Sequence, residues 1–157
     1  MTIAANAISQ VWIDAHRHLS GTPGPLATVV RSQGLIACDH QSDRVRALVW
    51  AIVGQQLSTR AAATIRKRLD ERLGPGPLLV ALAGVPDADL FACGLSGAKV
   101  RCVRDLASRV NDRTLAPDQF DTLPDGEIRR SLVAVRGIGP WTADMFLIFV
   151  MCRAHET

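Results

Sequence analysis

The chain has 157 residues, a length that suits one domain or two small lobes. Hydrophobic residues make up 48% and charged residues 21% of the sequence, which excludes a chain that is disordered throughout. The net charge is +3, and 16 of the 18 basic residues are arginines. This mildly basic balance permits a nucleic-acid partner without requiring one.

Targeting and metal-binding patterns are missing from the sequence. No apolar run reaches the roughly 20 residues of a membrane-spanning helix, and the N-terminus lacks the pattern of a signal peptide. No two of the four cysteines have C-x-x-C spacing, which disfavours a zinc ribbon or an iron–sulfur site. We therefore expect a cytoplasmic protein with reduced thiols, no cofactor and no membrane partner.

Clusters of glycine and proline divide the sequence into segments of helical periodicity, and no alternating run predicts a strand. We therefore predict an all-α fold. The expected helices cover residues 8–18, 25–33, 43–52, 58–73, 86–93, 97–110, 126–135 and 140–152. Asp43 and Ser58 are suited to cap two of them, and Pro140 occupies a favoured first-turn position. The last helix is apolar nearly all round, so we expect it to be buried centrally.

The most informative segment is residues 132–143, where one helix ends, a Gly-x-Gly turn follows and a second helix begins. Gly137 and Gly139 permit a positive φ and a close approach of the backbone to a ligand. The first turn of the second helix directs free amides and a positive dipole end outward. The segment thus predicts a phosphate site that reads no base sequence. An ordinary tight helix–helix turn is the alternative.

Three segments together resemble the helix-hairpin-helix DNA glycosylase superfamily, most closely its 3-methyladenine DNA glycosylase II branch. They are Ala51–Ser58 (A-I-V-G-Q-Q-L-S), Gly94–Lys99 (G-L-S-G-A-K) and Gly137–Phe146 (G-I-G-P-W-T-A-D-M-F). The resemblance implies an all-α, two-lobed glycosylase fold. In it, residues 1–42 form an N-terminal helical segment of the first lobe, and residues 43–157 form a helical lobe that contains the helix-hairpin-helix at 128–152.

The resemblance also implies an enzyme of base excision repair. Such an enzyme flips an alkylated purine, for example 3-methyladenine, out of duplex DNA and hydrolyses its N-glycosidic bond. The match places Gln56 in the gap that the flipped base leaves. The residues that the match assigns to DNA contact are Gln55, Gln56, Leu57, Ser58, Lys99, Gly137, Ile138, Gly139 and Thr142. The residues alone favour a polar pair that caps or bridges helices for the two glutamines, and Lys99 fits a solvated helix face equally well; the motif match shifts the glutamines to DNA contact.

Trp141 stands where glycosylases that also cut the DNA backbone have a lysine that forms a Schiff base. The resemblance therefore implies a monofunctional enzyme, in which Trp141 lines the base pocket. An indole face attracts a cationic alkylated base; packing between the lobes is the alternative. The family also implies a monovalent cation at the hairpin, held by the backbone carbonyls of Val133, Val135 and Ile138.

The catalytic aspartate of the family has no counterpart in the sequence. The resemblance places it a few residues after Thr157, together with further C-terminal helices. Asp144 occupies a separate position of the motif, and Glu156 lies on a free end, so neither is a substitute. We therefore expect little or no activity from residues 1–157. We expect a monomer for the full-length family and self-association here, because apolar surface would be uncovered. A non-catalytic helix-hairpin-helix module that binds duplex DNA is the alternative function.

Overall fold

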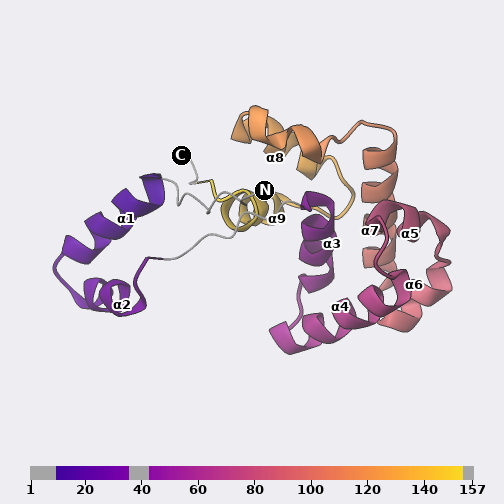
Figure 1. Ribbon diagram of the computed structural model, residues 1–157, viewed down its shortest axis with the longest axis horizontal. Helices are drawn as coiled ribbons and strands as arrows, with labels where there is room; N and C mark the ends of the chain where they lie inside the picture. The colour runs from indigo at the N-terminus through magenta and orange to yellow at the C-terminus, as the bar shows by residue number, and fades with distance from the viewer. Residues whose placement is uncertain (1–9, 36–42, 154–157) are drawn as a thin grey trace, which may run out of the picture. The chain divides into compact units, whose positions relative to one another are not determined.

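The computed structural model describes residues 10–35 and 43–153 (Figure 1). Within these residues the protein is helical and contains no strand, which confirms the all-α prediction. The elements are α1 (Gln10–Gly21), α2 (Pro25–Gln33), α3 (Arg44–Gly54), α4 (Thr59–Leu73), α5 (Leu78–Gly84), α6 (Asp87–Cys93), α7 (Gly97–Asn111), the 3-10 helix η1 (Pro117–Thr122), α8 (Asp125–Val133) and α9 (Pro140–Phe149).

The chain forms two compact units. One contains residues 1–41 and 147–157, and the other contains residues 42–146. In the first unit α1 packs against α2, and the indole Nε1 of Trp12 donates a hydrogen bond to the backbone carbonyl of Cys152 at 3.1 Å. The sequence-based division had placed the segment after residue 146 with the second domain. The three motif segments lie in the unit of residues 42–146, which therefore contains the site described below.

Side-chain caps position the starts of the helices that surround the site. Asp43 accepts a hydrogen bond from the backbone N–H of Arg46 at 2.9 Å, as predicted for the first turn of α3. Ser58 accepts one from the N–H of Ala61 at 3.3 Å at the start of α4. Ser96 caps α7 in the same way. These caps set the residues at which the loops before α4 and α7 end.

Two predicted helix ends and two short elements differ from the sequence-based expectations. α8 ends at Val133 and not at residue 135, because the N–H of Val135 bonds the carbonyl of Leu132, three residues back, and no longer follows the α-helical pattern. α9 ends at Phe149 rather than residue 152. The elements α5 and η1 are too short to show a helical period and were not predicted.

The expectation that the last helix is buried all round is wrong. Ala143 and Phe146 of α9 are buried, but Trp141 is 70% exposed and Phe149 is 65% exposed. Uniform apolarity of a helix indicates that some face is covered, but it does not identify that face.

α3 lies at the centre of the unit of residues 42–146, where it packs against α4, α7 and η1. Its side chains Leu48 and Ile52 are fully buried. At its start, the guanidinium of Arg44 donates to the Pro117 carbonyl at 2.9 Å and to the Asp121 carboxylate at 2.6 Å, which ties α3 to η1. The central, well-packed α3 therefore determines where the loop after it leaves the core.

Cys93 and Cys102 are buried free thiols, whereas Cys152 is disulfide-bonded, so the expectation of reduced thiols is wrong for Cys152. Spacing in the sequence does not show which Cβ atoms a fold brings within bonding range. Among residues 10–35 and 43–153, no helix is long and apolar enough to cross a bilayer. Over the same residues, no group of three His, Cys, Asp or Glu side chains is arranged to hold a metal ion.

Candidate functional site

The loop between α3 and α4 presents residues 55–58 at the surface. Gln55 closes α3, and the N–H of Leu57 bonds the carbonyl of Gly54 at 3.2 Å, so the chain reverses sharply. Gln56 has a φ of 56°, a left-handed conformation that is unfavourable for a residue with a side chain. Gln56, Leu57 and Ser58 are exposed. Such a strained and exposed residue persists only where its surroundings hold it, and it is often functional.

The side chain of Gln55 joins this loop to the turn before α9. Its Nε2 donates to the backbone carbonyl of Gly137 at 3.2 Å and to the hydroxyl oxygen of Thr142 at 3.3 Å. Thr142 is buried, so this bond satisfies a polar group that has little access to water. The structure therefore brings together two of the motif segments, which lie more than 80 residues apart in the chain.

The turn between α8 and α9 has one closed side and one open side. Gly137 has a φ of 79°, and a Cβ added there would lie 3.2 Å from the sulfur of Cys102 on α7. Ile138 is buried and its N–H bonds the carbonyl of Val135 at 3.1 Å. A Cβ added at Gly139 would meet no atom within 4 Å. The space that a side chain would need is thus occupied by α7 at Gly137, whereas it is open at Gly139, next to the first turn of α9.

Trp141 occupies the first turn of α9, two residues after Gly139. Its side chain is 70% exposed, so most of the indole is accessible to a ligand. The first turn of a helix also leaves backbone N–H groups without partners inside the helix, and the positive end of the helix dipole lies there. An exposed aromatic side chain therefore stands at the end of α9 where backbone N–H groups lack partners within the helix.

Two side chains of α7 bond backbone groups next to the loop at residues 55–58 and next to the turn before α9. The ammonium of Lys99 donates to the backbone carbonyls of Val53 at 2.7 Å and Gln55 at 2.9 Å. The carboxylate of Asp105 accepts the backbone N–H of Arg136 at 2.8 Å and the Nε of Arg109 at 2.9 Å. The hydrogen bond from the Arg136 backbone is the main reason that the pKa of Asp105 lies below its ordinary value. Both side chains hold backbone groups next to the predicted site.

A family model described as HhH-GPD superfamily base excision DNA repair protein matches residues 49–148 of this chain. The match includes the loop at 55–58, Lys99, Asp105 and the turn before α9. The chain belongs to this superfamily.

Relatives and solved structures agree with this HhH-GPD assignment. The DNA-3-methyladenine glycosylase 1 of Schizosaccharomyces pombe is 26% identical over 88% of this chain, and the chain spans 64% of its length. The crystal structure of a DNA-3-methyladenine glycosidase from Bacillus halodurans has a TM-score of 0.75 at 25% identity, covering 98% of this chain and 69% of that one. The structure of the S. pombe 3-methyladenine DNA glycosylase in complex with abasic DNA has a TM-score of 0.80 at 24% identity, covering 92% of this chain and 73% of that one.

The HhH-GPD signature residues thus occupy distinct positions. Gln56, Leu57 and Ser58 are exposed on the loop; Gly139 and Trp141 are accessible at the hairpin. Ile138 and Thr142 are buried and Gln55 is half-buried, whereas Gly137 is exposed although a Cβ added there would face Cys102. Lys99 of α7 is half-buried, and its ammonium bonds a carbonyl of α3 instead of standing on a solvated helix face. The DNA contacts of these residues and the cation at the carbonyls of Val133, Val135 and Ile138 stay predictions.

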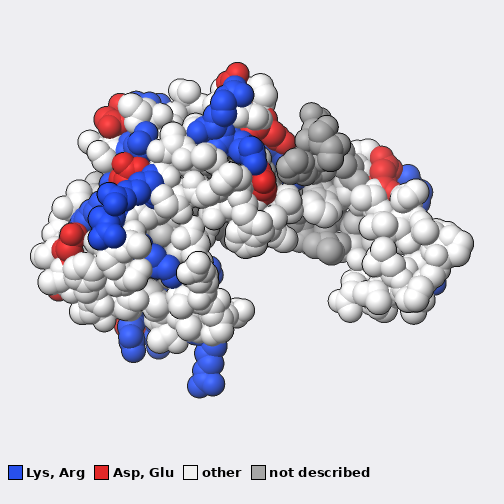
Figure 2. Space-filling model, turned by 180° about the vertical axis from the view of Figure 1, so that it is seen from behind, with Lys and Arg blue, Asp and Glu red and all other residues white. Residues whose placement is uncertain are grey.

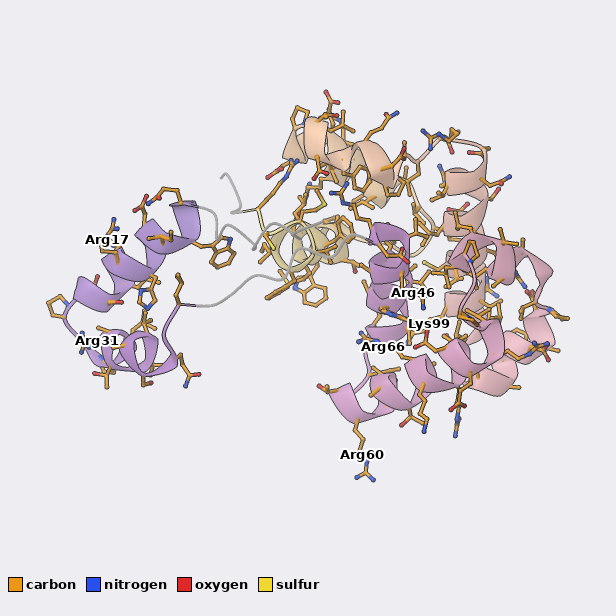
Figure 3. The ribbon with its side chains drawn as sticks, viewed as in Figure 1. Arg17, Arg31, Arg46, Arg60, Arg66 and Lys99 are labelled. Atoms are coloured by element: carbon orange, nitrogen blue, oxygen red, sulfur yellow. The ribbon has the colours of Figure 1, made fainter. Side chains whose placement is uncertain are left out.

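Basic side chains are distributed unevenly around the HhH-GPD site. Figure 3 shows Arg60 pointing away from the start of α4 into solvent, while Arg66 and Lys99 lie close to α3. Arg66 donates to the carbonyl of Trp50 at 3.2 Å, and its guanidinium lies over the Trp50 ring. On the face shown in Figure 2, basic and acidic side chains are interspersed over the unit of residues 42–146.

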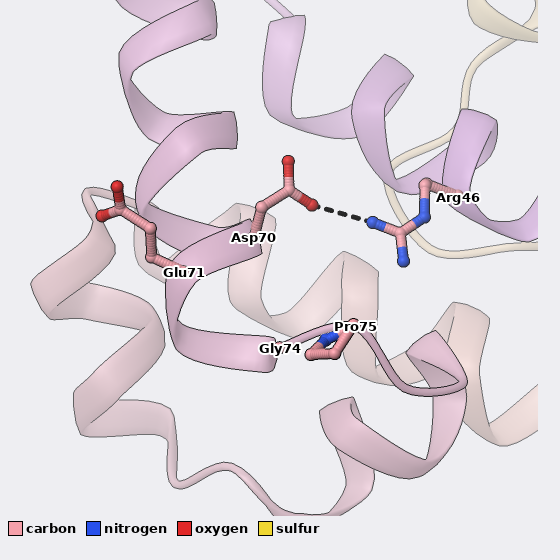
Figure 4. A pocket seen from close by; sticks show the side chains of 5 residues that line it. All are labelled: Arg46, Asp70, Glu71, Gly74 and Pro75. Atoms are coloured by element: carbon pink, nitrogen blue, oxygen red, sulfur yellow. Dashed lines mark hydrogen bonds and ion pairs between the residues drawn. The ribbon is translucent and has the colours of Figure 1, made fainter.

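A pocket of about 540 Å³ lies apart from these motif residues (Figure 4). It is lined by Arg46, Asp70, Glu71, Gly74 and Pro75. An ion pair of 2.8 Å between Arg46 and Asp70 occupies two of its polar groups. The pocket shares no residue with the loop at 55–58 or with the hairpin, so it contributes nothing to the site.

We expect the contribution of Asp105 to the free energy of unfolding to depend on pH, because its carboxylate bonds the backbone before the hairpin. Because the pKa of this carboxyl is lower in the folded protein than its ordinary value of 3.8, its stabilisation is complete above that value and is lost as the pH falls through the folded pKa. We expect Asp105→Ala to lower the free energy of unfolding by about 1 kcal/mol at neutral pH, since the carboxylate is partly open to solvent.

Urea unfolding at neutral pH and at a series of pH values below 3.8 checks this expectation. The difference between wild type and Asp105→Ala should shrink in acid. Asp105→Asn retains an oxygen that accepts the N–H of Arg136, so it should be less destabilising and nearly independent of pH. A difference for Asp105→Ala that stays constant through the acid range would contradict the assignment.

Proposed function

We propose that this protein is a base excision repair DNA glycosylase that removes alkylated purines of the 3-methyladenine type from duplex DNA. The observation that carries the proposal is the pair of hydrogen bonds from Gln55 to Gly137 and Thr142. They place an exposed loop with a projecting Gln56 beside a hairpin with an exposed Trp141. The relatives that match are named DNA-3-methyladenine glycosylases, which supports the substrate class.

Each exposed residue has a task in this proposal. Flipping a base leaves a gap in the stack, and Gln56 fills it from the loop. The hairpin amides near Gly139 bind a phosphate and position the protein on the duplex. Trp141 stacks on the extruded base, and its indole face favours the positive charge of an alkylated purine.

The proposed chemistry is hydrolysis without cutting of the DNA backbone. A Schiff base needs an amine at the hairpin, and the only lysines in the sequence are Lys67 and Lys99. Lys99 is engaged with two carbonyls on α3, and Lys67 lies on the exposed side of α4. Position 141 holds an indole, which cannot form an imine. These positions support a monofunctional enzyme.

Loss of the base requires a carboxylate that stabilises the developing positive charge on the sugar or activates water. Asp144 is the acidic residue of the hairpin motif, and its carboxylate bonds the Nε of Arg129 at 2.8 Å. This engagement supports a structural task for Asp144. Because Asp144 is engaged in this way, we expect residues 1–157 to bind damaged duplex DNA but to release little base.

Single-turnover release of bases from methylated duplex DNA, with protein in excess, tests this proposal. Duplex binding is measured in parallel at several salt concentrations, because a phosphate-binding protein loses affinity as salt rises. We expect salt-sensitive binding and base release close to the spontaneous rate. Release that is well above that rate and is lost in Asp144→Asn would show that Asp144 is the catalytic acid and that our assignment of the acid is wrong.

The other outcomes separate the competing functions. Preferential binding of duplex that carries a damaged or abasic site supports glycosylase recognition. Equal binding of damaged and undamaged duplex, without base release, would favour a helix-hairpin-helix module that only binds DNA. No measurable binding of any duplex at low salt would overturn the proposed function.

A further inference from the structure

We propose that Lys99 is a positioning residue for the loop at residues 55–58, and that it holds Gln56 in the projecting conformation needed to enter the duplex. The inference rests on the proposed function, because it gives Lys99 a task in the recognition of DNA. It differs from the sequence-based expectation that the ammonium contacts a phosphate.

The contacts of Lys99 are those of a cap on the C-terminal end of α3. Its Nζ lies 2.7 Å from the carbonyl oxygen of Val53 and 2.9 Å from that of Gln55, on a helix that is more than 40 residues away in the chain. The last carbonyls of a helix have no partner within the helix, and the negative end of its dipole lies there. A buried or half-buried cation on such carbonyls forms hydrogen bonds that are stronger than neutral ones.

The carbonyl of Gln55 is the decisive contact, because it belongs to the peptide group that connects Gln55 to Gln56. The hydrogen bond from Lys99 to this oxygen restricts the rotation of that peptide group, and so restricts the φ of Gln56, which is 56°. The side chain of Gln55 is held on another side by Gly137 and Thr142. The residue before Gln56 is therefore clamped at its backbone by α7 and at its side chain by the hairpin.

This clamp offsets the cost of the left-handed conformation of Gln56. A residue with a side chain in that region is less stable by about 1–2 kcal/mol than in its preferred conformations. Without the clamp the loop would relax, and Gln56 would no longer project at one fixed position. Preorganisation of this kind spares the protein the ordering cost when it binds its ligand.

A direct phosphate contact fits the geometry of Lys99 less well. An ammonium group has three donors, and two of them are used on the carbonyls of α3. The side chain is half-buried, and burial lowers the pKa of Lys99. Lys67 is the appropriate comparison, because it is the other lysine of the chain, is 79% exposed and forms only a distant ion pair of 3.9 Å with Glu71.

The first test measures the loop itself and needs no DNA. In Lys99→Met the methylene stem remains but the ammonium is lost. We expect amide hydrogen exchange at Gln55 and Leu57, whose N–H groups bond Ile52 and Gly54, to become at least tenfold faster. Lys67→Met should leave these rates unchanged. Unchanged exchange in Lys99→Met would overturn the positioning assignment, whatever the protein binds.

The second test measures the affinity of the whole chain for a duplex that contains a tetrahydrofuran abasic-site analogue, at several salt concentrations. We expect Lys99→Met to lower affinity about tenfold, which corresponds to the loss of a charged hydrogen bond. The slope of log K against log salt should not change, because no counterion is released by Lys99. A lysine that contacts a phosphate would reduce that slope by about 0.9 instead.

A double-mutant cycle with Gln56→Ala separates positioning from a general structural effect. If Lys99 acts through Gln56, Lys99→Met should cost little further affinity once Gln56 is alanine. Lys99→Arg, which keeps a cation and several donors, should recover most of the affinity. A slope reduced by about 0.9, or a full tenfold loss in the Gln56→Ala background, would overturn the inference. A wild-type protein that binds no duplex would instead overturn the proposed function.

Discussion

Replacement of Gly137 by alanine is expected to destabilise the protein by about 3 kcal/mol, whereas the same replacement at Gly139 is expected to be nearly neutral. Gly137 has a φ of 79°, which costs a residue with a side chain about 1–2 kcal/mol. A Cβ there would also lie 3.2 Å from the sulfur and 3.4 Å from the Cβ of Cys102, which is buried in α7. Neither condition applies to Gly139, so it serves as a control within the same turn.

Urea unfolding of both variants measures the difference through the transition midpoint. Adding Cys102→Ala to Gly137→Ala removes the nearest atom of the clash, so it should recover the steric part of the loss. The part that comes from the positive φ should remain. Equal midpoints for Gly137→Ala and Gly139→Ala would contradict the geometry of the turn.

The same two variants also separate stability from function. Gly139 lies where the backbone is open, so an added methyl group would face an approaching phosphate. We therefore expect Gly139→Ala to fold normally and to bind duplex DNA more weakly, which assigns the open side of the hairpin to the ligand.

The second large effect is expected at Trp141 and concerns recognition rather than stability. Trp141→Ala should unfold at nearly the same urea concentration as the wild type, because the side chain is 70% exposed. It should lose about tenfold in affinity for duplex DNA that carries 7-methylguanine, since a desolvated cation–π contact contributes about 2 kcal/mol or less. Trp141→Phe retains a ring face and should lie between the two.

Comparing the affinities for a cationic and a neutral base tests whether Trp141 contacts the base through its charge. Replacing 7-methylguanine with its neutral 7-deaza counterpart removes the positive charge and retains the methyl group. The wild type should prefer the cationic base, and Trp141→Ala should lose that preference. Phe91→Ala, which removes a 49% exposed aromatic side chain from α6, should change neither affinity. An unchanged preference in Trp141→Ala would remove Trp141 from the base pocket.

Much of the local structure was predictable from residues that lie close together in the sequence. The helical class follows from the apolar period, and Asp43 and Ser58 cap α3 and α4 as expected. The turn at Gly137 was predictable because glycine adopts a positive φ without strain. The three motif segments and their order were sufficient to indicate the superfamily, because each motif consists of residues that are consecutive in the sequence.

The contacts that build the site were decided by the tertiary structure. The sequence offered a helix-bridging alternative for Gln55 but named no partner; in the structure Gln55 bonds the hairpin 82 residues further on, and Lys99 caps α3 across 44 residues. Arg66 contacts Trp50, and Asp105 receives the backbone of Arg136. A cap or a turn depends on interactions within a few residues, which a sequence shows directly. The partner of a long polar side chain depends on which helices meet and which carbonyls they leave unpaired, and only the packing of α3, α7 and α9 decides that.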